Sequence, residues 1–600
     1  MNVCSLSNPE IDKTKIRLVS VREKLAELDL DAFVVPRSDE HLGEYVPPEE
    51  ERLKWLTGFT GSAGLGIVLR NSAAIFVDGR YTIQVRQQLP ADTFEFKHAT
   101  KDSPAEWLLE KLAANSKVGI DTRLHSMDWF RKMEHELRQN KIEVVELDKN
   151  PIDLCWKDRP KPCDDEIMLL EESFTGISSR TKRDTAAKVI RERKADFALI
   201  TQLDSIAWIL NIRGNDVPRL PVARSFAILE SNGEVIIFID EKKLPENFFD
   251  HAGEGVEWKK NEELEEHLQR LGRKDCKISV DPRTSNAWCQ LTCLKAGADL
   301  VEASDPTILA KSIKNETELD GIRNCHLRDG AALTRFLAWL DNEVKRGIYH
   351  DEKRLADELE SYRSNLEHFQ GLSFDTISAT GENAALAHYN YLNGVPSKLE
   401  PDSLYLVDSG AQYLDGTTDI TRTIAIGTPN EEHKKMFTLV LKGHIALAEA
   451  VFPKGTTGAN LDVLARQYLW REGFDYDHGT GHGVGAFLSV HEGPQSISKS
   501  AHSQELIPGM VISNEPGFYK EGDYGIRCEN LVVVVENFDS MLSFDTISFA
   551  PFDHSLIDPN LLSEQEIYWV NSYHETTRRK LAPFLIKKDL EWLEASTRKI

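Results

Sequence analysis

The stretch from Leu404 to Ile426, LYLVDSGAQYLDGTTDITRTIAI, decides the fold of the C-terminal half of the chain. Its apolar run from Leu404 to Asp408 predicts a β-strand, and Thr417 to Ile426 predicts the returning strand. Between them, the glycine-bounded segment from Gly410 to Gly416 supplies the turn region. We therefore expect a β-hairpin here.

The register of this hairpin decides whether its acidic residues meet. With the turn centred between Tyr413 and Leu414, Asp408 and Asp419 lie directly opposite each other. Opposed residues hold their Cβ atoms about 5 Å apart. The hairpin is therefore predicted to present two carboxylates on one face.

A second acidic hairpin is predicted further along the chain. Met510 to Glu515 runs as a strand toward a turn near Gly522, and Gly525 to Val535 returns. This places Glu515 opposite Glu529. Like charges opposed in a sheet destabilise it unless one carboxylate takes a proton or a cation lies between them. Two such pairs predict a metal site.

The segment His478 to Gly485, HGTGHGVG, separates the two hairpins. Its glycines allow close backbone approach, and His482 can supply a nitrogen ligand. Four carboxylates and one imidazole can balance two divalent cations. Hard oxygen donors favour manganese or magnesium, with cobalt and zinc possible. Two such metals would activate a shared water for hydrolysis.

These residues, in this order and with the motifs HGTGHG, SNEPG and IRCE around them, resemble the dinuclear site of the pita-bread metallopeptidases, peptidase family M24. The whole chain is similar to the long, three-domain, cytosolic type of Xaa-Pro aminopeptidase (aminopeptidase P), over nearly all 600 residues. The resemblance implies two divalent ions, manganese first. It implies Asp408 as a terminal ligand of one metal, Asp419 and Glu529 as bridging ligands, and His482 with Glu515 on the second metal.

The resemblance also implies roles for residues around the metals. A lone histidine is usually a core or surface residue, but three stand where the family places its outer catalytic residues. His491 would hydrogen-bond the substrate carbonyl and its oxyanion, while His388 and His478 would line the proline side. The acidic ligands would be supported by Arg422 and Arg527.

The implied reaction is hydrolysis of the N-terminal Xaa-Pro bond of a peptide by a hydroxide bridging the metals, with Glu515 passing a proton to the leaving proline nitrogen. The Xaa-Pro bond lacks an N–H group, which many other peptidases require. One departure concerns the sequence after His388-Tyr389, where family members often have proline two residues on. Here Asn390 and Tyr391 follow, so we expect a differently shaped rim of the proline pocket.

Composition narrows the possible partners. There are 72 basic and 97 acidic residues, and the formal charge of −25 makes nucleic acid and anionic membranes poor partners. Neither a signal-peptide core nor an apolar run of about 18 residues occurs, which predicts a cytoplasmic location. The eight cysteines contain no C-x-x-C pair, which argues against a disulfide framework or a cysteine zinc site. Cys289 and Cys293 are expected to be small apolar residues on a helix face.

A repeated plan predicts the domain organisation. Helix 16–28 precedes strand 32–36, and helix 180–193 precedes strand 195–200, each pair being followed by further strands. We expect two α/β domains, residues 1–157 and 158–311, which the resemblance identifies as tandem creatinase-like domains. The glycine cluster 56–64 opens a run of strands, so it predicts tight turns rather than a phosphate loop.

The third predicted domain covers residues 312–600, with a C-terminal extension from about 537. Asn315 caps a long helix that runs to about Val344. Further helices are expected at 354–364, 437–451, 461–473, 564–581 and 589–596. Helices outside a curved antiparallel sheet form the α+β arrangement that the pita-bread resemblance implies.

Two alternatives stay open. A prolidase, which cleaves only Xaa-Pro dipeptides, shares the metal set, although the duplicated N-terminal domain counts against it. A non-catalytic pita-bread binding protein is the other, although all five ligand residues are retained. We also expect a homodimer built through the catalytic domain, with Trp470 either at the subunit contact or in the core. The N-terminal repeats are expected to restrict the site to extended peptides.

Overall fold

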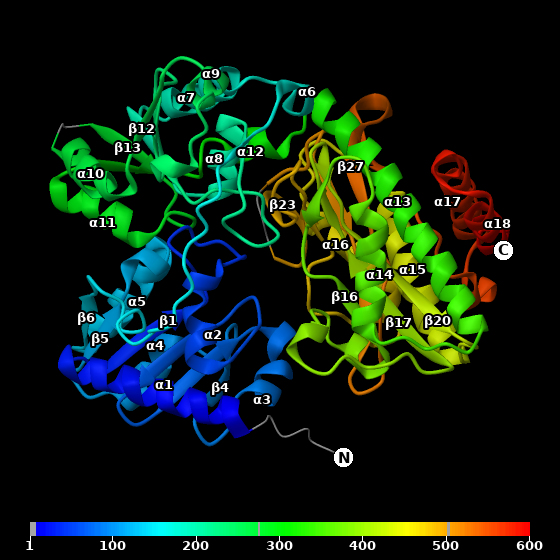
Figure 1. Ribbon diagram of the computed structural model, residues 1–600, viewed down its shortest axis with the longest axis horizontal. Coiled ribbons are helices and arrows are strands. Elements are labelled where there is room, and N and C mark those ends of the chain that lie inside the picture. The colour runs from blue at the N-terminus through cyan, green and yellow to red at the C-terminus, as the bar shows by residue number, and fades with distance from the viewer. Residues whose placement is uncertain (1–7, 274–275, 501–503) are drawn as a thin grey trace. The chain divides into compact units, whose positions relative to one another are not determined.

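The computed structural model describes residues 8–273, 276–500 and 504–600, which form two compact units (Figure 1). The first unit contains the chain up to residue 169 together with 177–218 and 222–307. The second contains residues 308–600 together with the short segments 170–176 and 219–221. Every residue of the predicted metal site lies in the second unit.

The first unit contains two six-stranded sheets. The strands of the first sheet are β1 (Ala32–Pro36), β2 (Leu65–Leu69), β3 (Ala73–Val77), β4 (Glu95–His98), β5 (Lys117–Ile120) and β6 (Glu143–Glu146). Those of the second sheet are β8 (Phe197–Ile200), β10 (Phe226–Glu230), β11 (Val235–Phe238), β12 (Val256–Lys259), β13 (Lys277–Val280) and β14 (Asp299–Glu302).

The two sheets have the same topology. Their strand orders are β4-β3-β2-β1-β5-β6 and β12-β11-β10-β8-β13-β14. In the first, β1 to β3 form an antiparallel meander and the remaining pairs are parallel. In the second, β8, β10 and β11 form the same meander with the same parallel neighbours. The predicted repeat is therefore confirmed, and the glycine cluster 56–64 leads into the meander, as expected.

Helices precede both central strands. Helix α1 (Asn8–Glu27) lies before β1 and α7 (Ser179–Glu192) before β8. Helix α11 (Ala287–Ala296) carries Cys289 and Cys293, and both side chains are buried in the apolar core of the second sheet. Their predicted role as small apolar residues is confirmed.

The second unit begins with α12 (Ile308–Ser312) and the 30-residue helix α13 (Glu316–Lys345). The side chain of Asn315 accepts a hydrogen bond from the Glu318 amide, and the Glu318 carboxylate accepts one from the Asn315 amide. This capping box satisfies two amides that the helix itself leaves without partners. The predicted start of the helix is confirmed.

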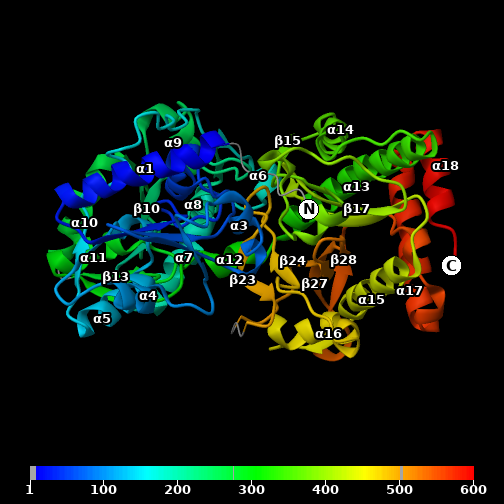
Figure 2. The same ribbon diagram turned by 90° about the horizontal axis from the view of Figure 1, so that it is seen from below.

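The other helices of this unit are α14 (Glu352–Ser364), α15 (Glu431–Ala448), α16 (Gly458–Arg471), α17 (Glu564–Leu581) and α18 (Lys587–Ser596). The largest correction concerns α15, which starts six residues before the predicted 437 because Asn430 caps it. Figure 2 shows α13 and α14 on one side of the strands, with α15 and α16 on the other.

The strands between these helices are mainly antiparallel. They are β15 (Phe369–Leu372), β16 (Ile377–Thr380), β17 (Ser403–Ser409), β18 (Ala411–Tyr413), β19 (Gly416–Thr417), β20 (Ile420–Ile426), β21 (Val451–Pro453), β22 (Gly481–Gly483), β23 (Glu492–Ile497), β24 (Val511–Asn514), β25 (Gly517–Lys520), β26 (Tyr524–Arg527), β27 (Asn530–Glu536) and β28 (Met541–Thr546). The main sheets are β16-β17-β20 and β21-β28-β27-β24-β22-β23. The predicted strand 542–550 ends earlier, at Thr546.

The first acidic hairpin forms, but its predicted register is wrong. Asp408 pairs with Thr421, and Gln412 pairs with Thr417, so the turn is centred one position later, between Leu414 and Asp415. The shift moves every pairing by two residues. Since side chains alternate with period two, Asp419 stays on the same face as Asp408 but lies diagonally to it rather than directly opposite.

Contacts with α13 explain this turn position. Arg328 on α13 donates to both carboxylate oxygens of Asp415, at 2.6 and 2.8 Å. A Cβ at Gly416 would lie 2.7 Å from Cys325 Sγ and 3.1 Å from Ile322 Cα. The turn therefore packs against the helix at a position where only glycine fits.

The second acidic hairpin has the predicted register. Asn514 pairs with Asn530, and Gly517 pairs with Arg527. Glu515 and Glu529 occupy the matching positions between these two pairs. Gly522 at the tip has φ +71°, in the left-handed region that glycine adopts readily.

The C-terminal segment packs α17 and α18 against α13. Trp470 on α16 is 44% exposed, so the alternative of a core role is wrong. Among the helices that the structure describes, none has an apolar stretch of the length needed to cross a bilayer.

Candidate metal centre

The five predicted ligands come from five separate strands or strand ends. Asp408 lies on β17, and Asp419 immediately precedes β20. His482 is the middle residue of β22, Glu515 directly follows β24, and Glu529 directly precedes β27. Strands of two sheets, β16-β17-β20 and β21-β28-β27-β24-β22-β23, therefore bring together residues up to more than a hundred positions apart in the chain.

His482 occupies the centre of the cluster. Its Nε2 lies 3.5 Å from Asp419 Oδ2 and 3.4 Å from Glu515 Oε1. One ligand atom each from Asp419, His482 and Glu529 lies within 4.8 Å of the others. The Nδ1–H of His482 donates to the Gly483 carbonyl oxygen at 3.0 Å, which leaves Nε2 as the ligating nitrogen.

The glycines of HGTGHGVG let β22 approach its neighbours. A Cβ at Gly481 would lie 2.0 Å from the Ser513 carbonyl oxygen, and one at Gly483 would lie 2.4 Å from that of Glu492. Any larger residue would push His482 out of the cluster. The predicted reason for these glycines is confirmed.

Arg527 holds one edge of the cluster. Its guanidinium donates to Asp408 Oδ2 at 2.6 Å and to the Tyr519 hydroxyl at 2.7 Å. It also donates through Nε to Thr421 Oγ1 at 3.2 Å. The Thr421 hydroxyl in turn donates to Glu529 Oε2 at 2.6 Å. Arg527 thus supports one carboxylate directly and another through a hydroxyl.

Two hydroxyl residues of the cluster had no role in the sequence analysis. Thr421 enters the site because the true register places it opposite Asp408. Ser513 accepts from the His482 amide at 2.9 Å and donates to Glu515 Oε1 at 3.1 Å. Ser513 stands inside the SNEPG motif, so only the motif pointed toward it.

The carboxylates perturb one another strongly. Burial raises the pKa of Asp408 to about 6, opposed by Arg527 and assisted by the Asp419 charge. Burial raises the pKa of Glu515 to about 7. Burial and the neighbouring acids raise the pKa of Glu529 well above its ordinary value. For His482, burial lowers the pKa, but its hydrogen bond to Asp419 and the Glu515 charge raise it to about 9.

A cation fits this cluster. The Oδ1 atoms of Asp408 and Asp419 are buried and have no hydrogen-bond partner among the described residues. Buried carboxylate oxygens are normally paired or bound to metal. A divalent ion would supply the missing partner and relieve the repulsion that raises the carboxylate pKa values. The donor set, oxygens plus one imidazole, suits manganese and its neighbours.

His491 lies on the solvent side of the cluster. Its ring packs edge-to-face against His482, with centroids 4.4 Å apart, and the residue is exposed. A group at this place can reach a molecule bound beside the metals.

His478 is held by a chain of hydrogen bonds. Its Nδ1–H donates to the Gly479 carbonyl oxygen at 2.7 Å, and its Nε2 accepts from the Tyr519 hydroxyl at 2.8 Å. Because Arg527 donates to that same hydroxyl, the hydroxyl proton points to His478. His478 is therefore oriented by Arg527 through Tyr519, a residue without a sequence-based role.

The His388 segment adjoins Arg527, which donates to the Ala387 carbonyl oxygen at 3.4 Å. His388 itself is half-buried. At the sequence departure, Asn390 donates to Asp375 Oδ2 at 3.2 Å and accepts from the Leu392 amide at 2.9 Å. This asparagine begins a short helical turn, Tyr391–Asn393, at the point of the departure.

Arg422 does not reach a carboxylate of the cluster through any of its described hydrogen bonds. It donates to the carbonyl oxygens of Glu529, Ala550 and Pro551 and to the Asn530 side chain. Arg422 was expected to support the acidic ligands. It supports the main chain of Glu529 rather than its carboxylate.

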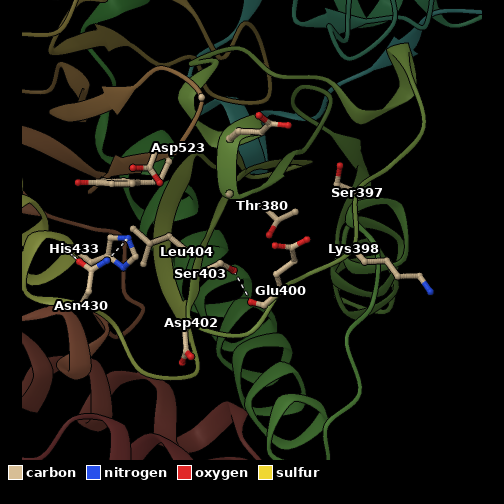
Figure 3. Close-up of a pocket in the computed structure, with 14 residues that line it drawn as sticks. Thr380, Ser397, Lys398, Glu400, Asp402, Ser403, Leu404, Asn430, His433 and Asp523 are labelled. Atoms are coloured by element: carbon tan, nitrogen blue, oxygen red, sulfur yellow. Dashed lines mark hydrogen bonds between the residues drawn. The ribbon is translucent and has the colours of Figure 1, made fainter. Parts of the chain in front are cut away.

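Figure 3 shows a different pocket of the same unit, of about 430 Å³. Its lining includes the carboxylates of Glu400 and Asp523 and the ring of His433, whose Nε2 accepts a hydrogen bond from Asn430 at 3.3 Å. The lining contains no predicted site residue, so the acids there are separate from the metal cluster.

Family models match the chain over almost its whole length. Residues 320–536 match metallopeptidase family M24, and 540–600 match the C-terminal region of that peptidase. Residues 17–152 and 158–318 each match the Creatinase/Prolidase N-terminal domain. The two N-terminal matches agree with the repeated sheet topology.

Individual relatives also span the chain. It is 40% identical to a probable Xaa-Pro aminopeptidase P of Aspergillus fumigatus, covering 98% of this chain and 93% of the relative. It is 40% identical to one of Tuber melanosporum, covering 97% and 99%. The crystal structure of an X-prolyl aminopeptidase from Caenorhabditis elegans, a cytosolic enzyme with a di-nuclear active site, matches with a TM-score of 0.93 at 34% identity, covering 98% of this chain and 100% of that one.

Proposed function

The chain belongs to metallopeptidase family M24, and from this premise we propose that it hydrolyses the N-terminal Xaa-Pro bond of peptides as a metallo-aminopeptidase. The observation that carries the proposal is the buried cluster of Asp419, His482 and Glu529 in a chain similar over its whole length to Xaa-Pro aminopeptidases. Its fold is two creatinase-like α/β domains followed by a pita-bread domain. We place the boundaries at 1–157, 158–311 and 312–600.

The centre is proposed to hold two divalent metal ions, with Asp408, Asp419, His482, Glu515 and Glu529 as ligands. Manganese is the proposed ion, because hard carboxylate oxygens dominate the donor set. When bound, such ions lower the pKa of water and polarise the scissile carbonyl. The unpartnered Oδ1 atoms of Asp408 and Asp419 are the observation that supports ligand roles for both residues.

Residues beside the cluster have roles in handling the substrate. His491 is proposed to donate a hydrogen bond to the substrate carbonyl oxygen as charge develops on it, and its exposed position next to His482 supports this role. Glu515 is proposed to carry a proton to the leaving proline nitrogen. His478, with both ring nitrogens already bonded, would pack against the proline side together with His388.

Specificity would come from the peptide's amino end and from proline. A free α-amino group close to the carboxylates would limit cleavage to the first bond. The N-terminal domains are proposed to shield the site so that only extended peptides enter. Asp408 and Arg527 tie this edge of the site to the His388 segment, which supports a rigid proline pocket.

We also propose that the protein acts in the cytoplasm as a homodimer formed through its catalytic domain. The Caenorhabditis elegans relative is a cytosolic enzyme, which supports the location. Trp470 and Phe474, 44% and 42% exposed near the end of α16, support an interface there. The net charge of −25 argues against nucleic acid as a partner.

Peptide assays test the function. Metal-free protein is incubated with Arg-Pro-Pro and, separately, with an Xaa-Pro dipeptide, each with and without Mn²⁺. Release of arginine from the tripeptide only when Mn²⁺ is added is the expected result. Cleavage of the dipeptide alone would indicate a prolidase, and no cleavage of either with Mn²⁺ bound would indicate a binding protein.

A further inference from the structure

A fully buried histidine is hydrogen-bonded to the residues next to two of the proposed ligands. His444 is on α15, a helix that supplies none of the proposed ligands, and its side chain is 0% exposed. Its Nδ1 lies 3.1 Å from the Asn514 carbonyl oxygen, and its Nε2 lies 3.2 Å from Asn530 Nδ2. The Asn514 side chain donates back to the His444 carbonyl oxygen at 2.9 Å.

The partners of His444 leave one arrangement of protons. A carbonyl oxygen can only accept, so the proton on Nδ1 must point to Asn514. Nε2 then carries a lone pair and accepts from the Asn530 amide group. The neutral ring that this requires agrees with the pKa of His444, which burial and the charge of Arg422 lower to about 3.

The far side of Asn530 is fixed in the same way. Arg422 donates to Asn530 Oδ1 at 2.9 Å and to the Glu529 carbonyl oxygen at 2.7 Å. An oxygen that accepts from arginine leaves the amide nitrogen to face His444, so the Asn530 side chain has one orientation. Tyr573 on α17 lies 3.3 Å from the same oxygen.

The two residues held by His444 are the sequence neighbours of two proposed ligands. Asn514 immediately precedes Glu515, and Asn530 immediately follows Glu529. Strands β24 and β27 pair at these asparagines, so both glutamates leave the ladder at the point where His444 is bonded. A displacement of either asparagine would displace the adjacent glutamate, because a single peptide unit joins the two residues.

We propose that His444 is a positioning residue of the metal centre, acting through Asn514 and Asn530 to set the places of Glu515 and Glu529. It touches neither metal nor substrate. Partners of this kind behind metal ligands typically change metal affinity by about 10- to 100-fold. The proposal rests on the proposed function only in taking the two glutamates as ligands.

The test compares two histidines of the same helix. His444→Phe removes both hydrogen bonds while keeping a ring of similar shape. The matched control is His433→Phe, eleven residues earlier on α15, which is 6% exposed, packs against Tyr524 and lies in the pocket of Figure 3. Mn²⁺ affinity is measured by titration calorimetry on metal-free protein without peptide, and hydrogen exchange is followed over residues 511–533.

We expect His444→Phe to bind Mn²⁺ about 10- to 100-fold more weakly than the natural protein. We also expect faster exchange at residues 511–517 and 528–533 in the metal-free state. His433→Phe should change neither quantity. The proposal would be overturned if His444→Phe kept the Mn²⁺ affinity and the hydrogen-exchange rates of the natural protein. It would also be overturned if the two variants lost Mn²⁺ affinity equally.

Two partial variants keep the proposal testable if His444→Phe does not fold. His444→Asn retains a donor near the position of Nδ1, and His444→Gln retains an acceptor near that of Nε2. Weakened Mn²⁺ binding in either supports the proposal, and natural affinity in both overturns it. Peptide cleavage is measured separately. If the natural protein binds Mn²⁺ but cleaves no peptide, the proposed function is refuted and the proposal for His444 is not. Hydrogen exchange in the metal-free protein tests whether His444 positions the two glutamates without any metal.

Discussion

Replacing Thr421 by valine removes the hydroxyl that links Arg527 to Glu529 in the metal centre. The Thr421 side chain is fully buried, and its hydroxyl donates to Glu529 Oε2 at 2.6 Å while accepting from Arg527 Nε at 3.2 Å. Valine keeps the branched shape and replaces the hydroxyl with a methyl group. Glu529 then loses a donor, and Arg527 loses an acceptor, with little change in packing.

The expected loss follows from the charge on the acceptor. A hydrogen bond to a charged group is worth about 1.5 to 3 kcal/mol. At about 1.4 kcal/mol for each tenfold change, this corresponds to Mn²⁺ affinity about 10- to 150-fold weaker. Burial raises the pKa of Glu529, and the Thr421 hydrogen bond lowers it. Without that bond a proton competes better for the carboxylate, which acts in the same direction.

Titration calorimetry with Mn²⁺ on metal-free protein measures this loss. Thr421→Ser keeps the hydroxyl and should stay close to natural affinity. Thr423→Val is the matched control, because Thr423 lies two residues along β20 and its hydroxyl donates to the Arg527 main-chain oxygen at 3.1 Å. A Thr421→Val protein within twofold of natural affinity would refute the reasoning, and so would an equal loss in Thr423→Val.

Three further predictions concern the same centre and the assembly. Asp419→Asn should nearly abolish activity and reduce the bound metal below two ions per chain while leaving the fold intact, because a buried ligand charge is removed; natural turnover with two metals by elemental analysis would contradict the assignment. His491→Ala should keep its metals but lose about 100-fold or more in kcat, since one oxyanion donor is removed; loss of metal would instead make His491 a ligand. Light scattering at micromolar concentration should give a dimer, and Trp470→Lys should shift it toward one chain of 67.9 kDa; a fully active single chain in the natural protein would rule out the dimer as a requirement.

Much of the architecture was readable from local pattern. The N-terminal repeat follows from two copies of a helix followed by a buried strand, and the identical topologies of the two sheets confirm it. Glu515 and Glu529 could be paired correctly because Gly522 marks the tip of their hairpin, and positive φ at the tip is a property of the residue itself. Structural features that depend on a few residues adjacent in the chain can therefore be predicted from the sequence.

The register of the first hairpin was not visible in this way. Its turn contains several residues that tolerate a bend, and local preference did not separate two positions that differ by one residue. The contacts of Asp415 with Arg328 and of Gly416 with α13 selected the later one. Both partners lie about ninety residues away in the chain, so the energy that decides the turn is tertiary.

The same reasoning separates ligands from their supports. Acids and a histidine in apolar strands can be recognised in the sequence as candidate ligands, because a buried charge is normally paired or bound to a metal. Thr421, Ser513 and His444 do not stand out, since hydroxyls and imidazoles are common and acquire a partner only when strands pair and helices pack. By itself the sequence determined which residues could bind metal, and only the tertiary structure decided which hydrogen bonds hold them in place, because those bonds join segments that no local preference connects.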